Sequence, residues 1–315
     1  MATTKRTTRK ATRPRSSARS RPPARRGPRT VRMAVGPPAA PAPGDGVVPM
    51  IDERKAAGAV RILNCVPSSD QSDDWDVASA QAAGMLAARA ALPASVDLRT
   101  AWWRIGDQGS TGSCVGWATA DSVLRWHLVT SGRIAERDRL SVRFVWMAAK
   151  ETDEFTQRPT TFIEPEGTSL KAALDVARRY GAVRDTDLPF ARPKLFAGDA
   201  KAFYLLASQL KITAYVNLGR DTAAWRNWLA TQGPILTRLD CDATWMDART
   251  TKGVLARYDA ASASGGHAVA LVGYTGDHFI VRNSWGTTWG DKGFAYASFP
   301  YATEAFTEAY GVNVA

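Results

Sequence analysis

The most informative part of this 315-residue chain is the stretch DQGSTGSC, residues 107–114. It is a polar, glycine-rich turn that delivers Cys114 to the first turn of an apolar helix, predicted over residues 114–129. A helix N-terminus carries about half a positive charge, which lowers the pKa of a thiol and favours the nucleophilic thiolate. Cys114 is therefore a candidate nucleophile, with Ser113 as the expected N-cap. The alternative is an inert, buried cysteine after an ordinary turn.

A second region supplies a candidate base. His267 opens a predicted strand, 267–273, and Asn283 closes another, 279–283. If the two strands form a hairpin that turns near residue 275, His267 and Asn283 come opposite one another within a residue or two. An Asn side chain in that place accepts an imidazole N–H, fixes the tautomer and aims the other ring nitrogen outward. The sequence thus predicts a Cys114–His267 pair oriented by Asn283.

The other histidines do not suit this role. His127 would lie about 20 Å from Cys114 along the same helix and on a nearly opposite face, at about 1.5 Å per residue. His278 is expected in a solvated turn. The sequence contains no CxxC pair, HExxH motif, P-loop or histidine cluster, so no metal or other cofactor is expected.

The remaining pattern places helices first and strands later, which favours an α+β fold. A helix over residues 169–180 is predicted with Thr168 as its N-cap, and another carries Trp225 and Trp228. The further strands are predicted at 211–218, 234–239 and 294–298.

Taken together, these segments resemble the papain family of cysteine proteases. The matching blocks are residues 92–99 (LPASVDLR), 108–109 (QG), 112–114 (GSC), 266–269 (GHAV) and 283–286 (NSWG), followed by Trp289, Gly290 and Gly293. The resemblance covers about residues 92–315. It implies an α+β, two-lobed fold, in which a helical lobe bears Cys114, an antiparallel β-barrel-like lobe bears His267 and Asn283, and a cleft separates them.

The resemblance also implies roles for individual residues. The Gln108 side chain would form an oxyanion hole with the Cys114 N–H, and Trp285 would shield the Asn283–His267 bond from water. The residues expected to contact a protein or peptide substrate are Gly112, Ser113, Gly167, Ala268 and Trp285. The chain departs from the family where Thr111 replaces a disulfide-forming cysteine and Val115 replaces a tryptophan.

The implied activity is that of a cysteine endopeptidase. Cys114 would form an acyl-enzyme, and His267 would act as general acid and base. Deamidation, isopeptide cleavage or transpeptidation would use the same residues, and these activities stay open as alternatives.

Charge sets the first part of the chain apart. Of the 41 Lys and Arg residues, twelve lie in residues 5–32, which contain no Asp or Glu, and this leaves 29 against 30 acidic residues in the rest of the chain. Residues 1–46 are also rich in proline and lack aromatic residues, so they are predicted to form a disordered basic tail. Such a tail suits nonspecific contact of residues 5–32 with nucleic acid, which would make a tethered binding protein the alternative function. A merely solubilising tail would have the same composition.

Residues 47–91 precede the family-like domain, 92–315, and are predicted to include a helix over 77–91. We expect them to form either a propeptide-like leader that partly covers the cleft or a strap on the back of the domain. Cys65 would then lie near Cys114 or near Cys241, and the first arrangement would suit thiol-dependent control.

The sequence also bears on the compartment of the protein. It has no recognisable secretory signal and no run of about 18 apolar residues, so a cytoplasmic or non-classically secreted protein without a membrane span is expected. Three cysteines fit a reducing compartment, although a Cys65–Cys241 disulfide stays open.

Overall fold

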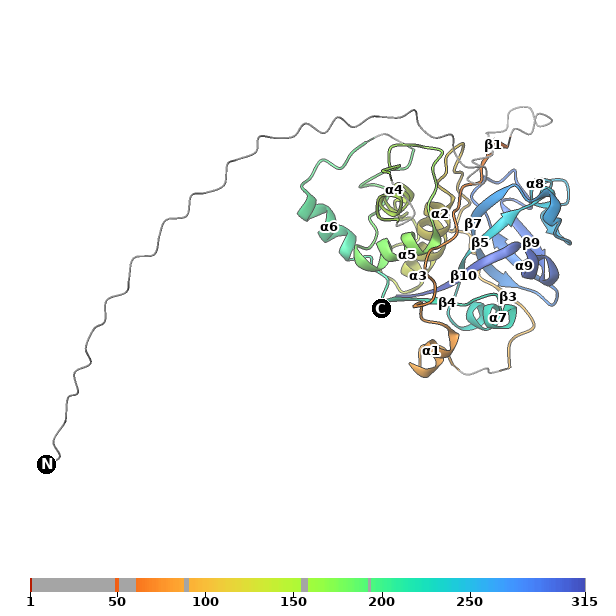
Figure 1. Ribbon diagram of the computed structural model, residues 1–315, viewed down its shortest axis with the longest axis horizontal. Helices are drawn as coiled ribbons and strands as arrows, with labels where there is room; N and C mark the ends of the chain where they lie inside the picture. The colour runs from red at the N-terminus through yellow and green to blue at the C-terminus, as the bar shows by residue number, and fades with distance from the viewer. Residues whose placement is uncertain (2–48, 51–60, 88–90, 154–157, 192–193, 315) are drawn as a thin grey trace, which may run out of the picture. The chain divides into compact units, whose positions relative to one another are not determined.

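The computed structural model (Figure 1) describes Met1 and residues 49–50, 61–87, 91–153, 158–191 and 194–314. The chain divides into two units, Met1–Pro43 and Gly44–Ala315, and the helices and strands of the described residues all belong to the second unit. The predicted tail, residues 1–46, lies outside the described residues except for Met1. Among the described residues, no helix is both long enough and apolar enough to cross a membrane.

The first half of the second unit forms a helical lobe around one central helix. This helix runs without a break over residues 114–130, close to the predicted 114–129, and its middle part is π-helical. Residues 112–125 are all buried, as expected of a helix that packs on every side. The helices of the lobe are α2 (Cys114–Gly116), η1 (Trp117–Leu124), α3 (Arg125–Thr130), α4 (Val142–Thr152), α5 (Leu170–Arg179) and α6 (Ala200–Ser208).

The second half forms a lobe around one largely antiparallel sheet with the strand order β4-β10-β5-β7-β8-β9-β6, and β3 pairs with β7. Only the β6–β9 pair is parallel among the described strands of this sheet. The strands are β3 (Val96–Asp97), β4 (Ala214–Asn217), β5 (Ile235–Cys241), β6 (Val254–Leu255), β7 (Gly265–Tyr274), β8 (His278–Arg282), β9 (Phe294–Ser298) and β10 (Phe306–Asn313). Three α-helices and a short 3₁₀ helix accompany the sheet: α7 (Thr222–Thr231), α8 (Ala243–Met246), η2 (Ala260–Ser262) and α9 (Phe299–Ala305).

Strand β7 joins the two lobes because both of its faces are buried. Ala268, Ala270 and Val272 belong to the core of the helical lobe, whereas Val269 and Leu271 belong to the core of the sheet lobe. This alternation follows from the two-residue period of a strand. The small side chains at 268 and 270 let the central helix approach the sheet, which brings the helix that starts at Cys114 close to the strand that carries His267.

The predicted α+β, two-lobed fold is confirmed, but several local predictions were wrong. The helix expected over 77–91 is only α1 (Val77–Ala82), because the chain turns at Gly84 with a φ of +71°. The N-cap of α5 is Ser169, whose Oγ accepts the Ala172 N–H. The predicted cap, Thr168, instead donates its hydroxyl to Asp153.

The segment before the domain runs along the junction of the two lobes, as the orange trace in Figure 1 shows. It begins with β1 (Pro49–Met50) paired with β2 (Arg61–Ile62). Residues 61–68, which we call the covering segment, then contact both lobes: the Cys65 N–H donates to the Gly266 carbonyl at 2.9 Å and the Val66 N–H to the Thr168 carbonyl at 3.3 Å.

Candidate active site

Cys114 is the first residue of the central helix, and its side chain is fully buried. Ser113 occupies the N-cap position as predicted, but its hydroxyl makes no capping bond and pairs with the Thr111 hydroxyl at 2.6 Å. A Cβ on Gly112 would lie 2.4 Å from the Pro165 carbonyl oxygen, so only glycine fits there. The turn before Cys114 is therefore packed closely against the backbone at residues 165–166.

His267 and Asn283 meet as the hairpin of β7 and β8 brings them together. His267 Nε2 lies 2.8 Å from Asn283 Oδ1, and both side chains are buried. The strands pair Ala270 with Arg282, so Asn283 lies two positions along β7 from His267 and on the same face. His267 Nδ1 is buried and has no hydrogen-bond partner among the described residues. The imidazole is thus fixed through one nitrogen and leaves the other one available.

Two tryptophan rings pack against the His267 ring. The Trp285 ring lies 4.9 Å from the His267 ring between centroids, and the Trp245 ring lies 5.7 Å from it. Both tryptophans are buried, and their rings lie 6.0 Å from one another. The three rings form one apolar cluster, and a hydrogen bond in such a medium is stronger than in solvent.

The Gln108 side chain is buried and held at both ends. Its Nε2 donates to the Thr111 carbonyl at 3.0 Å, and its Oε1 accepts the Ser284 hydroxyl at 2.9 Å. The Ser284 carbonyl also accepts the Gln108 N–H at 2.9 Å. This network orients the carboxamide, and one of the two hydrogens on Nε2 stays available to a further acceptor.

The surroundings of Cys114 favour its thiolate. The largest cause of the lowered pKa of the Cys114 thiol is its interaction with the neighbouring Cys65 thiol. Burial opposes this shift, whereas the His267 ring and the Ala268 N–H lower the pKa further. Burial and the neighbouring Cys114 raise the pKa of Cys65 in turn. Of the two thiols, Cys114 is therefore the one that ionises.

The covering segment rests on the backbone around this site. The Asn64 carbonyl oxygen lies where a Cβ on Gly167 would be, at 1.6 Å, so glycine is required at 167. Asn64 Nδ2 donates to the Pro165 carbonyl at 3.1 Å, and Arg238 Nε donates to the Cys65 carbonyl at 2.9 Å. Arg61 anchors the start of the segment, because its guanidinium donates to the carbonyls of Gly109 and Trp285. The segment thus lies on the face of the Cys114 site and not on the back of the domain.

Sequence reasoning did not single out Arg238, Glu308 or Ser284. Glu308 Oε1 accepts the Ser68 N–H at 2.9 Å, so Arg238 and Glu308 both bind the covering segment. Burial raises the pKa of the Glu308 carboxyl. One feature of the sequence could have indicated Arg238: it is a charged residue in the middle of the apolar strand β5. A buried charge requires a partner, so a partner for Arg238 was to be expected.

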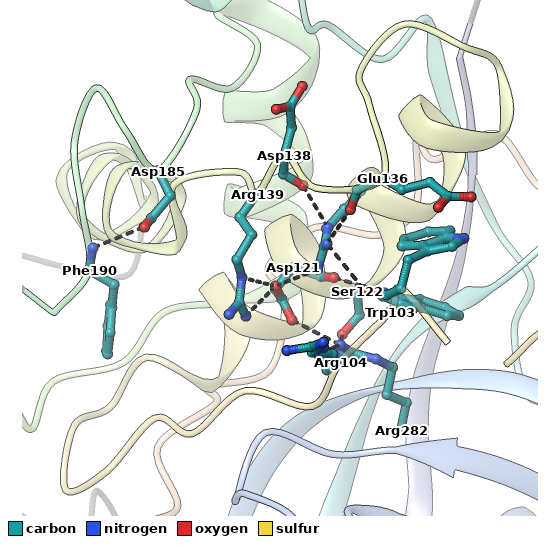
Figure 2. Close-up of polar contacts among 12 residues, drawn as sticks. Trp103, Arg104, Asp121, Ser122, Glu136, Asp138, Arg139, Asp185, Phe190 and Arg282 are labelled. Carbon is teal, nitrogen blue, oxygen red and sulfur yellow. Dashed lines mark hydrogen bonds and ion pairs between the residues drawn. The ribbon is translucent and has the colours of Figure 1, made fainter. Parts of the chain in front are cut away.

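Figure 2 shows an ion cluster around Asp121 that includes Arg282, the residue before Asn283 in the sequence. Arg282 Nη2 is 2.9 Å from Asp121 Oδ2, and Asp121 Oδ1 is 2.7 Å from Arg139 and 3.5 Å from Arg125. Burial favours the neutral acid, but the charges of the three arginines lower the pKa of Asp121. We call these four residues the Asp121 cluster. It ties the end of β8 to the central helix and so holds the neighbouring Asn283 in place.

The other titratable residues that the sequence drew attention to lie elsewhere. Burial lowers the pKa of His127 to about 4, so its ring is neutral. His278 begins β8 and pairs with Asp277 at 2.7 Å.

Cys65, Cys114 and Cys241 are all free thiols, so the Cys65–Cys241 disulfide that the sequence left open is not formed. No group of three or more His, Cys, Asp or Glu side chains suited to a metal ion occurs in the described part of the chain.

A helical lobe that presents a cysteine at a helix start, facing a histidine on an adjoining sheet lobe, defines the papain-like class of folds. The family model "Papain family cysteine protease" matches residues 92–304. The chain belongs to this family.

Individual relatives agree with this assignment. A cathepsin L-like proteinase of Fasciola hepatica is 23% identical over 212 residues, which are 65% of this chain and 60% of that protein. A cathepsin B-like protein of Giardia intestinalis is 34% identical over 89 residues, which are 27% of this chain and 29% of that protein. The chain thus spans less than two thirds of the length of either relative.

Solved structures share the fold. Xylellain, a cysteine protease from Xylella fastidiosa, is 21% identical and superposes with a TM-score of 0.64 over 80% of this chain and 96% of its own. A procathepsin B from Trypanosoma congolense is 18% identical, with a TM-score of 0.58 over 80% of this chain and 86% of its own.

Proposed function

We propose that this chain is a cysteine endopeptidase that hydrolyses peptide bonds through an acyl-enzyme on Cys114. The observation that carries this proposal is the His267 ring, which is bound to Asn283 through Nε2 and interacts with the Cys114 thiol. A thiolate with a lowered pKa beside an oriented imidazole is the arrangement that nucleophilic catalysis requires. Family membership supports the same chemistry.

The proposed reaction runs in two stages. The Cys114 thiolate attacks the peptide carbonyl carbon, and the oxygen takes the electron pair as an oxyanion next to the Cys114 N–H and Gln108 Nε2. The His267 imidazolium donates its Nδ1 proton to the leaving amine, which gives a thioester. Water then attacks the thioester as His267 takes back a proton, and the acid product leaves. Asn283 accepts the Nε2–H throughout and keeps that ring nitrogen protonated.

We further propose that the substrate main chain binds where the covering segment now lies. Gly112, Ser113, Gly167, Ala268 and Trp285 would then contact the substrate. The segment already uses backbone groups on both lobes, the carbonyls of Gly266 and Thr168. A bound peptide and the covering segment would compete for these groups, so the full chain is expected to be latent.

The test of the activity is a cleavage profile on a peptide library, with the Cys114→Ala chain as the control. We expect cleavage products only from the wild type. Release of ammonia from glutamine side chains without chain cleavage would indicate a deamidase instead. Products joined to an added amine would indicate a transpeptidase, and cleavage confined to Lys-linked isopeptides would indicate an isopeptidase.

The test of latency uses Arg61→Ala, with Arg99→Ala as a matched control. Arg61 ties the segment to Asp107, Gly109 and Trp285, whereas Arg99 makes a comparable pair with Asp97 on the sheet lobe. A lost hydrogen bond is worth about 0.5–1.5 kcal/mol, so Arg61→Ala should raise the initial cleavage rate about two- to tenfold. Equal rates in both variants would contradict latency by this segment.

A second proposed function is nonspecific nucleic-acid contact through residues 5–32. It is supported by the concentration of twelve basic residues in a stretch without acidic ones. Deleting residues 1–46 should abolish salt-dependent binding to a DNA duplex and leave peptide cleavage unchanged. Binding with an unchanged salt dependence after the deletion would exclude the tail as the contact.

A further inference from the structure

The covering segment presents a cysteine, and not an inert side chain, to the proposed nucleophile. Cys65 is 2% exposed and lies in the same buried core cluster as Cys114, and the two thiols interact electrostatically. Cys114 is also the residue whose oxidation would stop the proposed reaction. Two neighbouring buried thiols at such a point suit a specific covalent exchange.

The backbone holds Cys65 from both sides. Its N–H donates to the Gly266 carbonyl at 2.9 Å, one residue before His267, and its carbonyl accepts Arg238 Nε at 2.9 Å. Arg238 is itself fixed, because Nη1 donates to Thr307 Oγ1 at 2.7 Å and Nη2 pairs with Asp240 at 2.9 Å. Cys65 is therefore held next to Cys114 by main-chain contacts that do not depend on its thiol.

We propose that Cys65 and Cys114 form a reversible disulfide under peroxide stress, which locks the covering segment on the site and protects the nucleophile. This inference rests on the proposed function only for its consequence, the loss of peptidase activity. The disulfide itself depends only on the two thiols lying together in one buried core.

The chemistry proceeds in two balanced steps. The Cys114 thiolate attacks hydrogen peroxide: an S–O bond forms, the O–O bond breaks, and hydroxide leaves, so that sulfur is oxidised to sulfenic acid while the peroxide is reduced. Cys65 then attacks the Cys114 sulfur: the S–S bond forms, the S–O bond breaks, and the Cys65 proton leaves with the hydroxyl group as water. A small dithiol reverses the link by exchange and restores both thiols.

The ionisation of the two thiols fits this order. The lowered pKa of Cys114 makes it the thiolate that attacks peroxide first. Cys65 keeps its proton, because burial and the neighbouring Cys114 raise its pKa, and that proton is available to the departing hydroxyl group.

Cys241 offers an internal control. It lies at the end of β5 and is fully buried, and burial raises the pKa of its thiol. It is near enough to interact electrostatically with Cys114, but it belongs to the core of the sheet lobe, whereas Cys65 and Cys114 share the core of the helical lobe. Cys241 is therefore the competing partner against which the pairing of Cys65 must be tested.

The experiment compares the full-length wild type with Cys65→Ser and Cys241→Ser. Each reduced chain is treated with a small excess of hydrogen peroxide, its free thiols are alkylated, and its peptides are mapped by mass spectrometry without reduction. In the wild type and in Cys241→Ser we expect one peptide pair joined through Cys65 and Cys114, the loss of two titratable thiols, and full recovery of Cys114 labelling after dithiothreitol. In Cys65→Ser we expect Cys114 to advance to sulfinic acid, so that its labelling is not recovered.

Two outcomes would overturn the inference: a Cys114–Cys241 link in the wild type, or sulfinic acid at Cys114 in the wild type to the same extent as in Cys65→Ser. The readout is a mass, so it does not depend on catalysis. A chain that forms the disulfide but cleaves no peptide would refute only the proposed function. A peptidase that forms no such disulfide would refute only this inference.

Discussion

The Cys114 site and the Asp121 cluster lie on the same elements but differ in how far their titratable groups are paired. Cys114 and Asp121 are both on the central helix, and Asn283 directly follows Arg282 at the end of β8. Both oxygens of the Asp121 carboxylate have arginine partners, although Arg282 Nε is buried without a hydrogen-bond partner among the described residues. In the Cys114 site, by contrast, His267 Nδ1 and Asn283 Nδ2 are buried without hydrogen-bond partners among the described residues.

This difference separates a structural site from a reactive one. An unsatisfied buried polar group costs about 1–3 kcal/mol, so a site that leaves two of them is kept for a reason other than stability. The Asp121 cluster joins the lobes and fixes the backbone at Arg282. The neighbouring site can then hold an imidazole nitrogen free for proton transfer.

Removing the reactive side chains of the Cys114 site is expected to have the largest effect on activity and little effect on stability. Cys114→Ala and His267→Ala should each lower kcat/KM by at least about a thousandfold, because nucleophile and base act as a unit. The double variant should be little worse than either single variant. Both should keep a cooperative thermal transition near that of the wild type, since neither disturbs the ion pairs between the lobes. Peptide cleavage by Cys114→Ala at close to the wild-type rate would rule out the assignment.

Removing the carboxylate of the Asp121 cluster is expected to lower the stability of the fold. Asp121→Ala leaves three buried or half-buried arginines without their carboxylate and should lower the free energy of unfolding by about 3–5 kcal/mol. The matched control is Asp97→Ala. It breaks an exposed pair with Arg99 and should cost about 0–1 kcal/mol. Urea denaturation measures both values, and similar losses in the two variants would mean that the cluster has no special structural role.

Asn283 lies between these two regions, so an intermediate effect is expected. Asn283→Ala removes the acceptor of the His267 Nε2–H and should lower kcat/KM about 10- to 100-fold, as the loss of an orienting partner generally does. Asn283→Asp keeps an acceptor oxygen and should recover part of that loss. If Ala and Asp were equally impaired in steady-state kinetics, orientation of His267 would not explain the role of Asn283.

The sequence was sufficient for the fold and for the residues that converge at the site. The turn before Cys114, the glycines before His267 and the hairpin geometry are local features, and strand periodicity places His267 and Asn283 on one face. Helix ends were predicted less well. The interpretation of residues 77–91 relied on helix propensity, and the left-handed turn at Gly84 ends the helix earlier. At the start of α5, both Thr168 and Ser169 are suitable N-cap residues. In the fold the Thr168 hydroxyl binds Asp153, and Ser169 caps the helix.

Long-range partners could not be predicted. Arg238 and Glu308 bind the covering segment from strands more than 160 residues further along the chain, and no local pattern encodes that pairing. The same holds for Cys65. Its two possible neighbours, Cys114 and Cys241, were indistinguishable in the sequence, and the structure buries Cys65 in the same core as Cys114, whereas Cys241 lies in the core of the sheet lobe.

The smallest expected effect concerns the interaction of the Cys65 thiol with Cys114. Because this interaction is the largest cause of the lowered pKa of Cys114, Cys65→Ala in the full chain should raise that pKa. Below its pKa the thiol is protonated and unreactive, and above it the thiolate reacts, so the midpoint of iodoacetamide alkylation at Cys114 should move to higher pH. Cys65→Ser keeps a donor and should shift the midpoint less. Mass-resolved alkylation rates across a pH series measure both midpoints without requiring catalysis. Identical midpoints in the wild type and Cys65→Ala would show that His267 and the Ala268 N–H alone stabilise the thiolate, and the difference between this site and the paired carboxylate of Asp121 would then depend on the imidazole alone.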